Sequence, residues 1–200
     1  INGPLREDDD RILGSPLKSR WGYSTAKAID ELLAYTYWKE KEVPTVIVRL
    51  FNTVGPRQVG SYGMVIPRFV EQALKGNTVT VYGTGEQRRC FLHVSDAVHA
   101  LVQLMNEDRA VGNVYNVGSS EEITMSELAN RIIAMTGSSS LIEHISYDDA
   151  YEDGFEDMLR RFPSTEKLRL LTGWTPTIGL CEMLSSVIAY MRSCTSSSSS

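Results

Sequence analysis

Residues 22–51, GYSTAKAIDELLAYTYWKEKEVPTVIVRLF, decide the fold class of this 200-residue chain. Four apolar residues recur at helical spacing and predict a helix over about 22–41: Ile29, Leu32, Leu33 and Tyr37. Pro44 ends this helix, and an apolar run follows from Val46 to Val48, continued by Leu50 and Phe51. A short, continuous, β-branched run directly after a helix is typical of a buried strand in a parallel sheet. The chain is therefore predicted to be an α/β protein.

Further elements follow between loops rich in Gly, Pro and Asn. Helices are predicted over about 65–75, from 95 onward, and over about 124–135, 164–171 and 179–192, and strands over 78–82, 89–94 and 113–117. Ser95 is the predicted N-cap of its helix, and Thr124 with Glu127 forms a predicted capping box. Gly83-Thr84-Gly85 is predicted to be a hairpin turn, and residues 137–163 to be irregular.

Composition limits the possible classes of function. A formal net charge of −5 gives no general attraction for nucleic acid or anionic membranes, so an anionic ligand needs locally placed arginines. Three widely spaced cysteines favour neither a disulfide framework nor a zinc site, and they indicate a reduced, cytoplasmic compartment. No apolar run reaches the roughly 18–20 residues that span a bilayer. No metal site is predicted, since His93 and His99 lack clustered carboxylates and the acidic stretch 148–157 lacks the calcium-loop pattern.

Tyr23 and Lys27 lie one turn apart on the first predicted helix, so their side chains share a face. A phenol has a pKa of about 10 and is a poor base at neutral pH. A nearby ammonium favours the phenolate, which can accept a proton from a sugar hydroxyl while hydride leaves the same carbon. The same spacing is common on ordinary helices, where the phenol packs and the amine faces water. The interpretation therefore depends on the rest of the chain.

Six stretches supply that support. They are RWGYSTAKAIDELL (20–33), VRLFNTVGPRQ (48–58), YGMVIPRFVEQALKG (62–76), VTVYGTGEQRRCFLHVSDAVHAL (79–101), NVYNVGSSEEITMSELA (113–129) and EKLRLLTGWTP (166–176). In order and spacing they resemble the extended short-chain dehydrogenase/reductase family, and within it the sugar-nucleotide epimerases, dehydratases and decarboxylases. The likeness is closest to UDP-glucose 4-epimerase and UDP-glucuronate epimerases, with UDP-glucuronate decarboxylase next. The resemblance implies the carboxyl-terminal part of a Rossmann-like, doubly wound parallel sheet with a small α/β substrate-binding domain.

The resemblance also implies roles for individual residues. Tyr23 and Lys27 would be catalytic and, with Phe51 and Asn52, would contact NAD. Six residues would contact a UDP-sugar: Asn52, Val65, Arg68, Tyr82, Arg89 and Arg161.

Within that set, Arg89 and Arg161 would bind the diphosphate, because a planar guanidinium suits phosphate oxygens. Tyr82 would stack on the base. Simpler roles stay open: Asn52 as a turn residue, and Tyr82 and Val65 as packing residues. Arg160 is the alternative to Arg161 as the second phosphate-binding arginine.

The same comparison predicts how the chain is divided. Residues 1–60 would be the remainder of a dinucleotide-binding domain that includes the Tyr23 helix. Residues 61–192 would be mainly the substrate-binding domain with returning Rossmann elements, and residues 193–200 a disordered serine tail. The glycine-rich turn that meets the cofactor pyrophosphate is absent from the sequence, as is a preceding Ser or Thr, so roughly the first third of a full enzyme is expected to be missing.

The predicted function of the intact parent is NAD-dependent epimerisation of UDP-glucose or UDP-glucuronate at C4, through a 4-keto intermediate. UDP-glucuronate decarboxylation and NDP-sugar 4,6-dehydration share the first half-reaction and are alternatives. A third alternative, from a different class, is an inactive fragment that binds nucleotide sugars. The Tyr–Lys helix packs in two-fold dimers in the resembled family, which predicts a homodimer, although its apolar stripe also fits a plain core.

Overall fold

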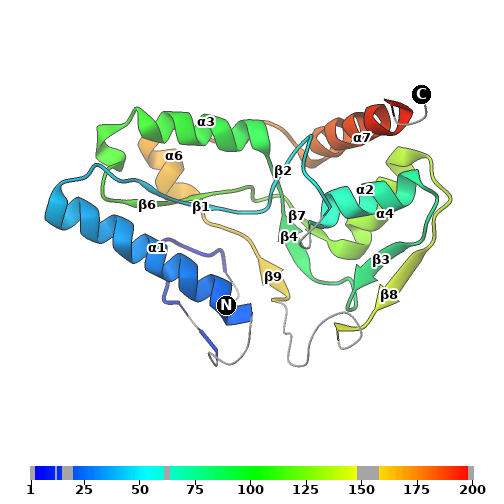
Figure 1. Ribbon diagram of the computed structural model, residues 1–200, viewed down its shortest axis with the longest axis horizontal. Helices are drawn as coiled ribbons and strands as arrows, with labels where there is room; N and C mark the ends of the chain where they lie inside the picture. The colour runs from blue at the N-terminus through cyan, green and yellow to red at the C-terminus, as the bar shows by residue number, and fades with distance from the viewer. Residues whose placement is uncertain (1–2, 12, 15–19, 61–63, 148–157, 198–200) are drawn as a thin grey trace.

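The computed structural model describes residues 3–11, 13–14, 20–60, 64–147 and 158–197. Their elements form two groups, each with a buried core of its own. One group is built around strands β1 (Ile47–Leu50) and β6 (Val114–Val117), and the other around β3 (Val79–Tyr82) and β8 (Ile142–Ile145). Figure 1 shows the two groups side by side along the long axis of the molecule.

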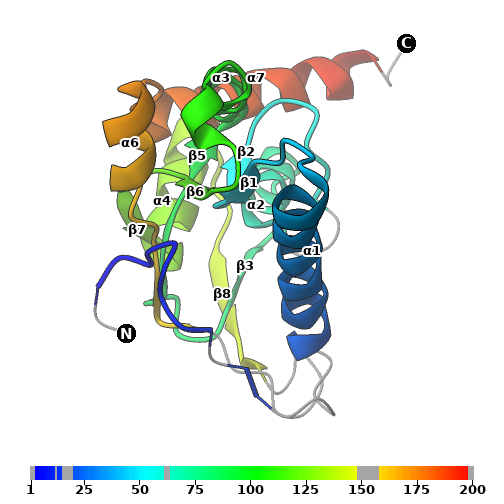
Figure 2. The same ribbon diagram turned by 90° about the vertical axis from the view of Figure 1, so that its left-hand side faces the viewer.

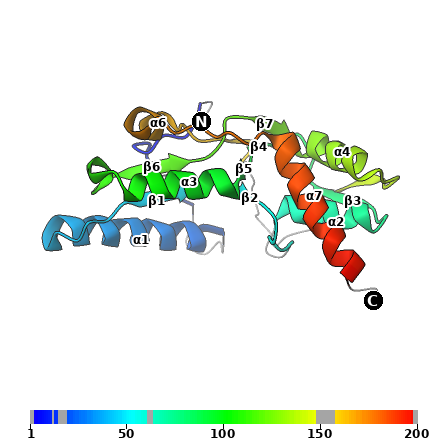
Figure 3. The ribbon, with the colours of Figure 1, turned by 90° about the horizontal axis from the view of Figure 1, so that it is seen from above.

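The first group has a parallel pair of strands at its centre. β1 runs parallel to β6, and β2 (Thr53–Val54) pairs in parallel with β5 (Leu92–His93) just beyond it. Three helices lie around the β1–β6 pair, as Figures 2 and 3 show: α1 (Arg20–Lys41), α3 (Val94–Met105) and α6 (Glu166–Thr172). A 3₁₀ turn, η1 (Asp108–Ala110), follows α3. The core of this group joins α3, β6 and α6 through residues such as Leu104, Val117 and Leu168.

The second group packs three helices against short strands. The helices are α2 (Val65–Leu74), α4 (Met125–Thr136) and α7 (Leu180–Ser197). β3 pairs in parallel with β8, and a separate three-stranded sheet has the order β7 (Glu122–Thr124), β4 (Arg88–Cys90), β9 (Arg160–Arg161). Fully buried side chains from all three helices, including Ile66, Leu128 and Leu184, fill the space between them.

Several predicted elements are confirmed. α1 and β1 lie where the opening stretch places them, and β1 is in a parallel pair. The capping box of Thr124 and Glu127 is present at the start of α4. The predicted burial of β1 is wrong, because its first three residues are only half-buried and Leu50 is 49% exposed. The reason is that β1 pairs with β6 alone within the part of the chain that the structure describes.

The predicted hairpin at Gly83-Thr84-Gly85 is also wrong. β3 and β4 do not pair, and the turn instead carries the chain from the β3–β8 pair into the three-stranded sheet. Both glycines have positive φ, at 69° and 77°, a conformation that L side chains rarely adopt. A side chain at Gly85 would also overlap Ser126. The glycines were therefore correctly assigned to a turn, but local sequence does not specify which strands pair.

Three smaller predictions need correction. His93, not Ser95, caps α3, since the Ser95 N–H donates to His93 Nδ1 at 3.2 Å. The supposedly irregular stretch 137–163 contains β8 and β9, while residues 148–157 lie outside the described part. α7 continues to Ser197 although the tail was expected to be disordered from residue 193, and residues 198–200 are not described. Serine hydroxyls can bond back to carbonyls of the preceding turn, as Ser193 does to Tyr190, so a helix end can accommodate them.

Candidate functional site

Tyr23 and Lys27 lie on an open face near the start of α1. Tyr23 is 75% exposed, and Lys27 Nζ is 5.9 Å from the centre of its ring. Lys27 also donates to Asp30 Oδ2 at 2.7 Å. This hydrogen bond, with the charge of Asp30, raises the pKa of Lys27, so the amine remains an ammonium. The helix thus presents a phenol beside a fixed cation.

A network of charged side chains holds α1 against β1. Arg49 on β1 donates from Nε and from one terminal nitrogen to the two oxygens of Glu31 on α1, at 2.9 and 2.8 Å. Its other terminal nitrogen donates to the carbonyl of Glu7 at 3.1 Å, and Arg11 adds a bond to Glu31. The hydrogen bonds from Arg49 lower the pKa of Glu31 despite its partial burial. The network fixes the helix that carries Tyr23 relative to the strand that leads to Phe51.

Phe51 and Asn52 follow β1 directly. Phe51 is buried, and the Arg161 guanidinium lies over its ring at 5.6 Å from the centre. Asn52 has a φ of 39°, which asparagine tolerates better than most residues, and its Nδ2 donates to the carbonyl of Cys90 at 2.7 Å. The end of β1 is therefore tied to β4 and lies beside β9.

Four arginines lie in register on β4 and β9. Arg88 is opposite Arg160, and Arg89 is opposite Arg161. Because side chains alternate along a strand, Arg89 and Arg161 share one face of this sheet and Arg88 and Arg160 share the other. The structure thus brings together four predicted residues from three separate segments, which we call the arginine group: Phe51, Asn52, Arg89 and Arg161.

The remaining predicted site residues, Val65, Arg68 and Tyr82, lie on α2 and β3. The Arg68 guanidinium lies 4.2 Å from the centre of the Tyr82 ring, and it donates to Thr80 Oγ1 at 3.3 Å. Val65 is half-buried one turn before Arg68 on α2. Arg68 Nε is buried without a hydrogen-bond partner in the described part of the chain. A cation therefore already lies against one face of the aromatic ring that was predicted to stack on a base.

Two of the charged pairs that the sequence predictions missed bear on the candidate site. One is Glu31 with Arg49, and the other is Glu122 on β7 with Arg160 on β9. A signal for the first was available, because Arg49 interrupts an otherwise apolar strand and a partly buried charge needs a partner. No comparable signal marks Glu122, since its partner lies 38 residues away in a strand of two residues.

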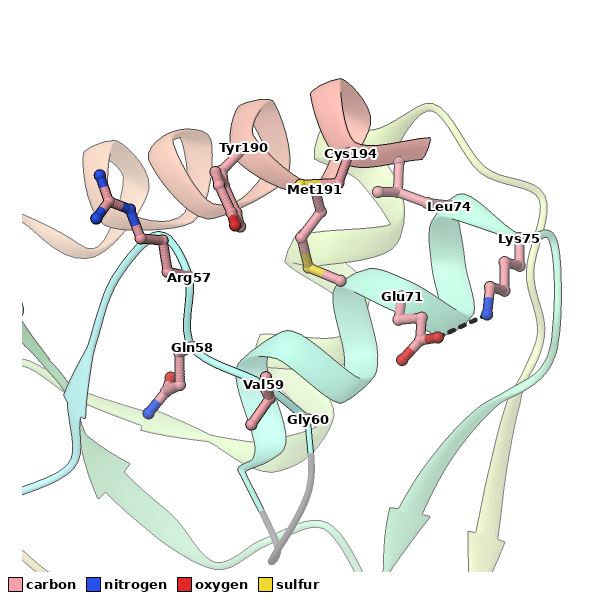
Figure 4. Close-up of a pocket in the computed structure, with 10 residues that line it drawn as sticks. All are labelled: Arg57, Gln58, Val59, Gly60, Glu71, Leu74, Lys75, Tyr190, Met191 and Cys194. Carbon is pink, nitrogen blue, oxygen red and sulfur yellow. Dashed lines mark hydrogen bonds and ion pairs between the residues drawn. The ribbon is translucent and has the colours of Figure 1, made fainter. Parts of the chain in front are cut away.

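A separate cavity of about 700 Å³ lies between the loop 57–60, α2 and α7 (Figure 4). Tyr190 and Met191 point into it from α7, and Glu71 forms an ion pair with Lys75 on its α2 side at 2.6 Å. None of the predicted site residues lines it. The cavity is therefore distinct from the arginine group and from the face of α1 that carries Tyr23.

No cluster of three or more His, Cys, Asp or Glu side chains suited to a metal ion occurs in the described ranges. Across those same ranges, none of the helices combines the length and the apolar character needed to cross a membrane.

The fold and the arginine group define an α/β protein with parallel strand pairs and a cationic site just beyond β1. A family model described as GDP-mannose 4,6 dehydratase matches residues 6–187, and the chain belongs to this family. This result confirms the predicted family of sugar-nucleotide enzymes.

Individual relatives agree with that assignment. The chain is 40% identical to UDP-N-acetyl-alpha-D-glucosaminuronate decarboxylase of Bacillus cytotoxicus, over 94% of this chain and 59% of the relative. It is 38% identical to UDP-glucuronic acid decarboxylase 1 of Xenopus tropicalis, over 89% of this chain and 40% of the relative. The chain thus spans 40–59% of the length of these relatives.

A solved structure agrees with the predicted fold. The crystal structure of dTDP-glucose 4,6-dehydratase from Bacillus anthracis, in complex with NAD, superposes with a TM-score of 0.81 at 27% identity. The match covers 96% of this chain and 56% of that one. The predicted α/β, Rossmann-like class is therefore confirmed.

Proposed function

We propose that this chain carries the proton-transfer pair and the nucleotide-sugar contacts of a NAD-dependent enzyme that acts at C4 of a UDP-sugar. The main support is the register of β4 and β9, which places Arg89 opposite Arg161 beside Phe51 and Asn52. Two guanidinium groups on one face suit the two phosphates of a nucleotide diphosphate. They also supply locally the positive charge that the chain as a whole lacks.

In this proposal Tyr23 accepts the proton of the C4 hydroxyl, with the Lys27 ammonium 5.9 Å from the centre of its ring. Asp30 holds that ammonium near the ring, and Arg49 with Glu31 holds α1 in place. The groups that would meet NAD are an exposed phenol and ammonium on α1, with Phe51 and Asn52 at the end of β1. When bound, NAD supplies the acceptor for the C4 hydride. Val65, Arg68 and Tyr82 would contact the sugar or the base.

Two outcomes of the resulting 4-keto sugar are candidates. Epimerisation of UDP-glucose or UDP-glucuronate at C4 is the reaction that the sequence resemblance favours. Decarboxylation of a UDP-uronate is the second candidate, and the names of the two relatives favour it. Incubation of the complete enzyme with UDP-glucuronate separates them, because only decarboxylation releases carbon dioxide.

The organisation of the parent is also a proposal. We assign residues 1–60 to a dinucleotide-binding domain and 61–192 mainly to a substrate-binding domain, followed by a serine tail. Pairing of two α1 helices in a homodimer is supported by the exposure of Ile29, Leu33 and Tyr37, each above 50%. A cytoplasmic location and the absence of nucleic-acid partners remain predictions from composition.

Titration calorimetry of this 200-residue chain with UDP tests the binding part. Removal of one charged hydrogen-bonding group should weaken UDP binding by about 10- to 100-fold. We therefore expect that loss in Arg161→Ala and in Arg89→Ala. Arg169→Ala is the matched control, because Arg169 pairs with Glu166 on α6, away from the site.

Equal UDP affinity in the wild type and both arginine variants would contradict the diphosphate role. A parallel titration with NAD addresses the alternative from a different class. UDP binding without NAD binding identifies this chain as a nucleotide-sugar-binding fragment.

A further inference from the structure

β9 is a strand of only two residues, and one of them belongs to the arginine group. Among the residues that the structure describes, Arg160 and Arg161 pair with β4 alone, and the Arg88 N–H donates to the carbonyl of Leu159 at 2.8 Å. So short a strand has few backbone bonds to hold it. Its two register pairs are also Arg opposite Arg, and like charges directly opposite each other destabilise a sheet. Backbone bonds with Leu5 anchor Phe162 and Ser164 just beyond β9, but they do not join β9 to β4. A side-chain contact between the strands would supply that link.

Glu122 on β7 links β7 to β9 across β4 by binding Arg160. It lies on β7 opposite Cys90, so it shares a face of the sheet with Arg88 and Arg160. Its oxygens accept from Arg160 Nε at 2.8 Å and from a terminal nitrogen at 2.6 Å, a two-pronged contact that fixes direction as well as distance. The Glu122 side chain is 16% exposed. The hydrogen bonds from Arg160, with the charges of Arg160 and Arg88, lower the pKa of Glu122, which keeps it ionised.

The two faces of β9 are coupled through its backbone. Arg160 is held on one face by Glu122 and by stacking on Phe162, with 4.4 Å between the guanidinium and the ring centre. Arg161, the next residue, must then project from the opposite face, where its guanidinium lies over Phe51.

We propose that Glu122 is a positioning residue for the nucleotide diphosphate. By holding Arg160 across β4, it fixes β9 so that Arg161 faces Phe51 and Asn52. The role rests on the proposed function, because it requires Arg161 to bind the diphosphate.

The direction of the change in UDP affinity in Glu122→Gln distinguishes a positioning role of Glu122 from a purely electrostatic effect of its charge. Glu122→Gln removes a negative charge near two arginines, so electrostatics alone predicts tighter binding of an anionic ligand. Positioning predicts the opposite, because Arg161 loses its fixed orientation. The loss should also be confined to ligands that carry the diphosphate, so uridine should be unaffected.

The experiment measures UDP and uridine binding to the 200-residue chain by calorimetry. We expect Glu122→Gln to weaken UDP binding roughly tenfold, at the low end of the loss expected when Arg161 itself is removed. Uridine affinity should change less than twofold. Glu166→Gln is the matched control, because it breaks another Glu–Arg pair of 2.6 Å, an exposed one on α6, and should leave both affinities unchanged.

A second measurement follows β9 without any nucleotide. Cys90 on β4 is buried, with Sγ 3.9 Å from the carbonyl of Arg161 on β9, and burial raises its pKa to about 11. In a Cys181→Ser, Cys194→Ser background, a thiol reagent should modify Cys90 several-fold faster when Glu122→Gln is added. Unchanged melting temperature would show that the acceleration comes from local opening and not from global unfolding.

The outcomes are distinguishable. A wild-type chain that does not bind UDP overturns the proposed function, and with it the diphosphate role of Glu122. UDP binding that is lost in Arg161→Ala but equal or tighter in Glu122→Gln overturns the positioning role alone. An unchanged rate of Cys90 modification shows that Glu122 does not hold β9, which also overturns it.

Discussion

Apolar side chains are exposed on one face of α1 but buried in the interior of the second group of elements. On α1 the apolar residues Ile29, Leu32 and Leu33 are between 52% and 63% exposed. In the second group, Leu128, Ile132 and Leu184 are fully buried between α2, α4 and α7. The second group is thus satisfied by its own contacts, whereas α1 carries an apolar stripe without a cover in the described residues.

The candidate site likewise has one part that the chain holds by its own contacts and one part that stands on the open face of α1. The arginine group depends on strand register and on bonds within the sheet, so its geometry is set by the chain itself. Tyr23 and Lys27 instead stand on the open helix face. Binding and chemistry are therefore expected to respond differently to substitution.

The largest expected effect is on turnover. In an enzyme that combines this chain with a dinucleotide-binding part, Tyr23→Phe should reduce turnover of UDP-glucuronate by about 10²- to 10⁴-fold, since it removes the proton acceptor. UDP affinity should change less than twofold. Product formation measured by chromatography, alongside calorimetry, checks both, and Tyr37→Phe on the same helix is the matched control. Unchanged turnover in Tyr23→Phe would exclude the proposed role.

Some features of the fold could be predicted from the sequence and others could not. The boundaries of α1, β1 and α4 were predictable because apolar spacing and capping residues act locally. The pairing of β3 with β8 was not, because glycines such as Gly83 permit a turn without selecting a partner strand.

The site shows the same division. Tyr23 and Lys27 were identifiable as a pair because they lie on one helix. Arg89 and Arg161 are 72 positions apart, and only the formation of β9 places them together. Their proximity was expected from family resemblance alone. Arg160 and Arg161 have no apolar pattern that predicts a strand, and β9 exists because β4 offers it an edge.

The second prediction compares leucines in the two regions. Leu128→Ala should lower the free energy of unfolding by about 2–5 kcal/mol, because it leaves a cavity in a filled core. Leu32→Ala, at 63% exposure, should change it by less than about 0.5 kcal/mol. Urea denaturation over a range of protein concentrations, starting from a low one, measures both. A cost for Leu32→Ala that approaches that of Leu128→Ala, and rises with concentration, would show that another copy covers α1 in solution.

The smallest expected effect concerns the network that joins α1 to β1. Glu31→Gln should lower the free energy of unfolding by about 1.5–3 kcal/mol at pH 7, because it weakens charged hydrogen bonds to Arg49. Glu71→Gln, which breaks an exposed pair with Lys75, should cost no more than about 1 kcal/mol and is the control.

The pH dependence of that difference identifies its cause. Folding lowers the pKa of Glu31 below the ordinary value of 4.5, so the native state favours the carboxylate. Its stabilisation is complete above pH 4.5 and is lost as the pH falls through the lower folded-state pKa. The gap between wild type and Glu31→Gln should therefore stay constant from pH 7 to about pH 5 and narrow below it. A gap that does not change down to pH 3 would mean that the glutamate acts through packing and not through its charge, and that α1 is held to β1 by other contacts.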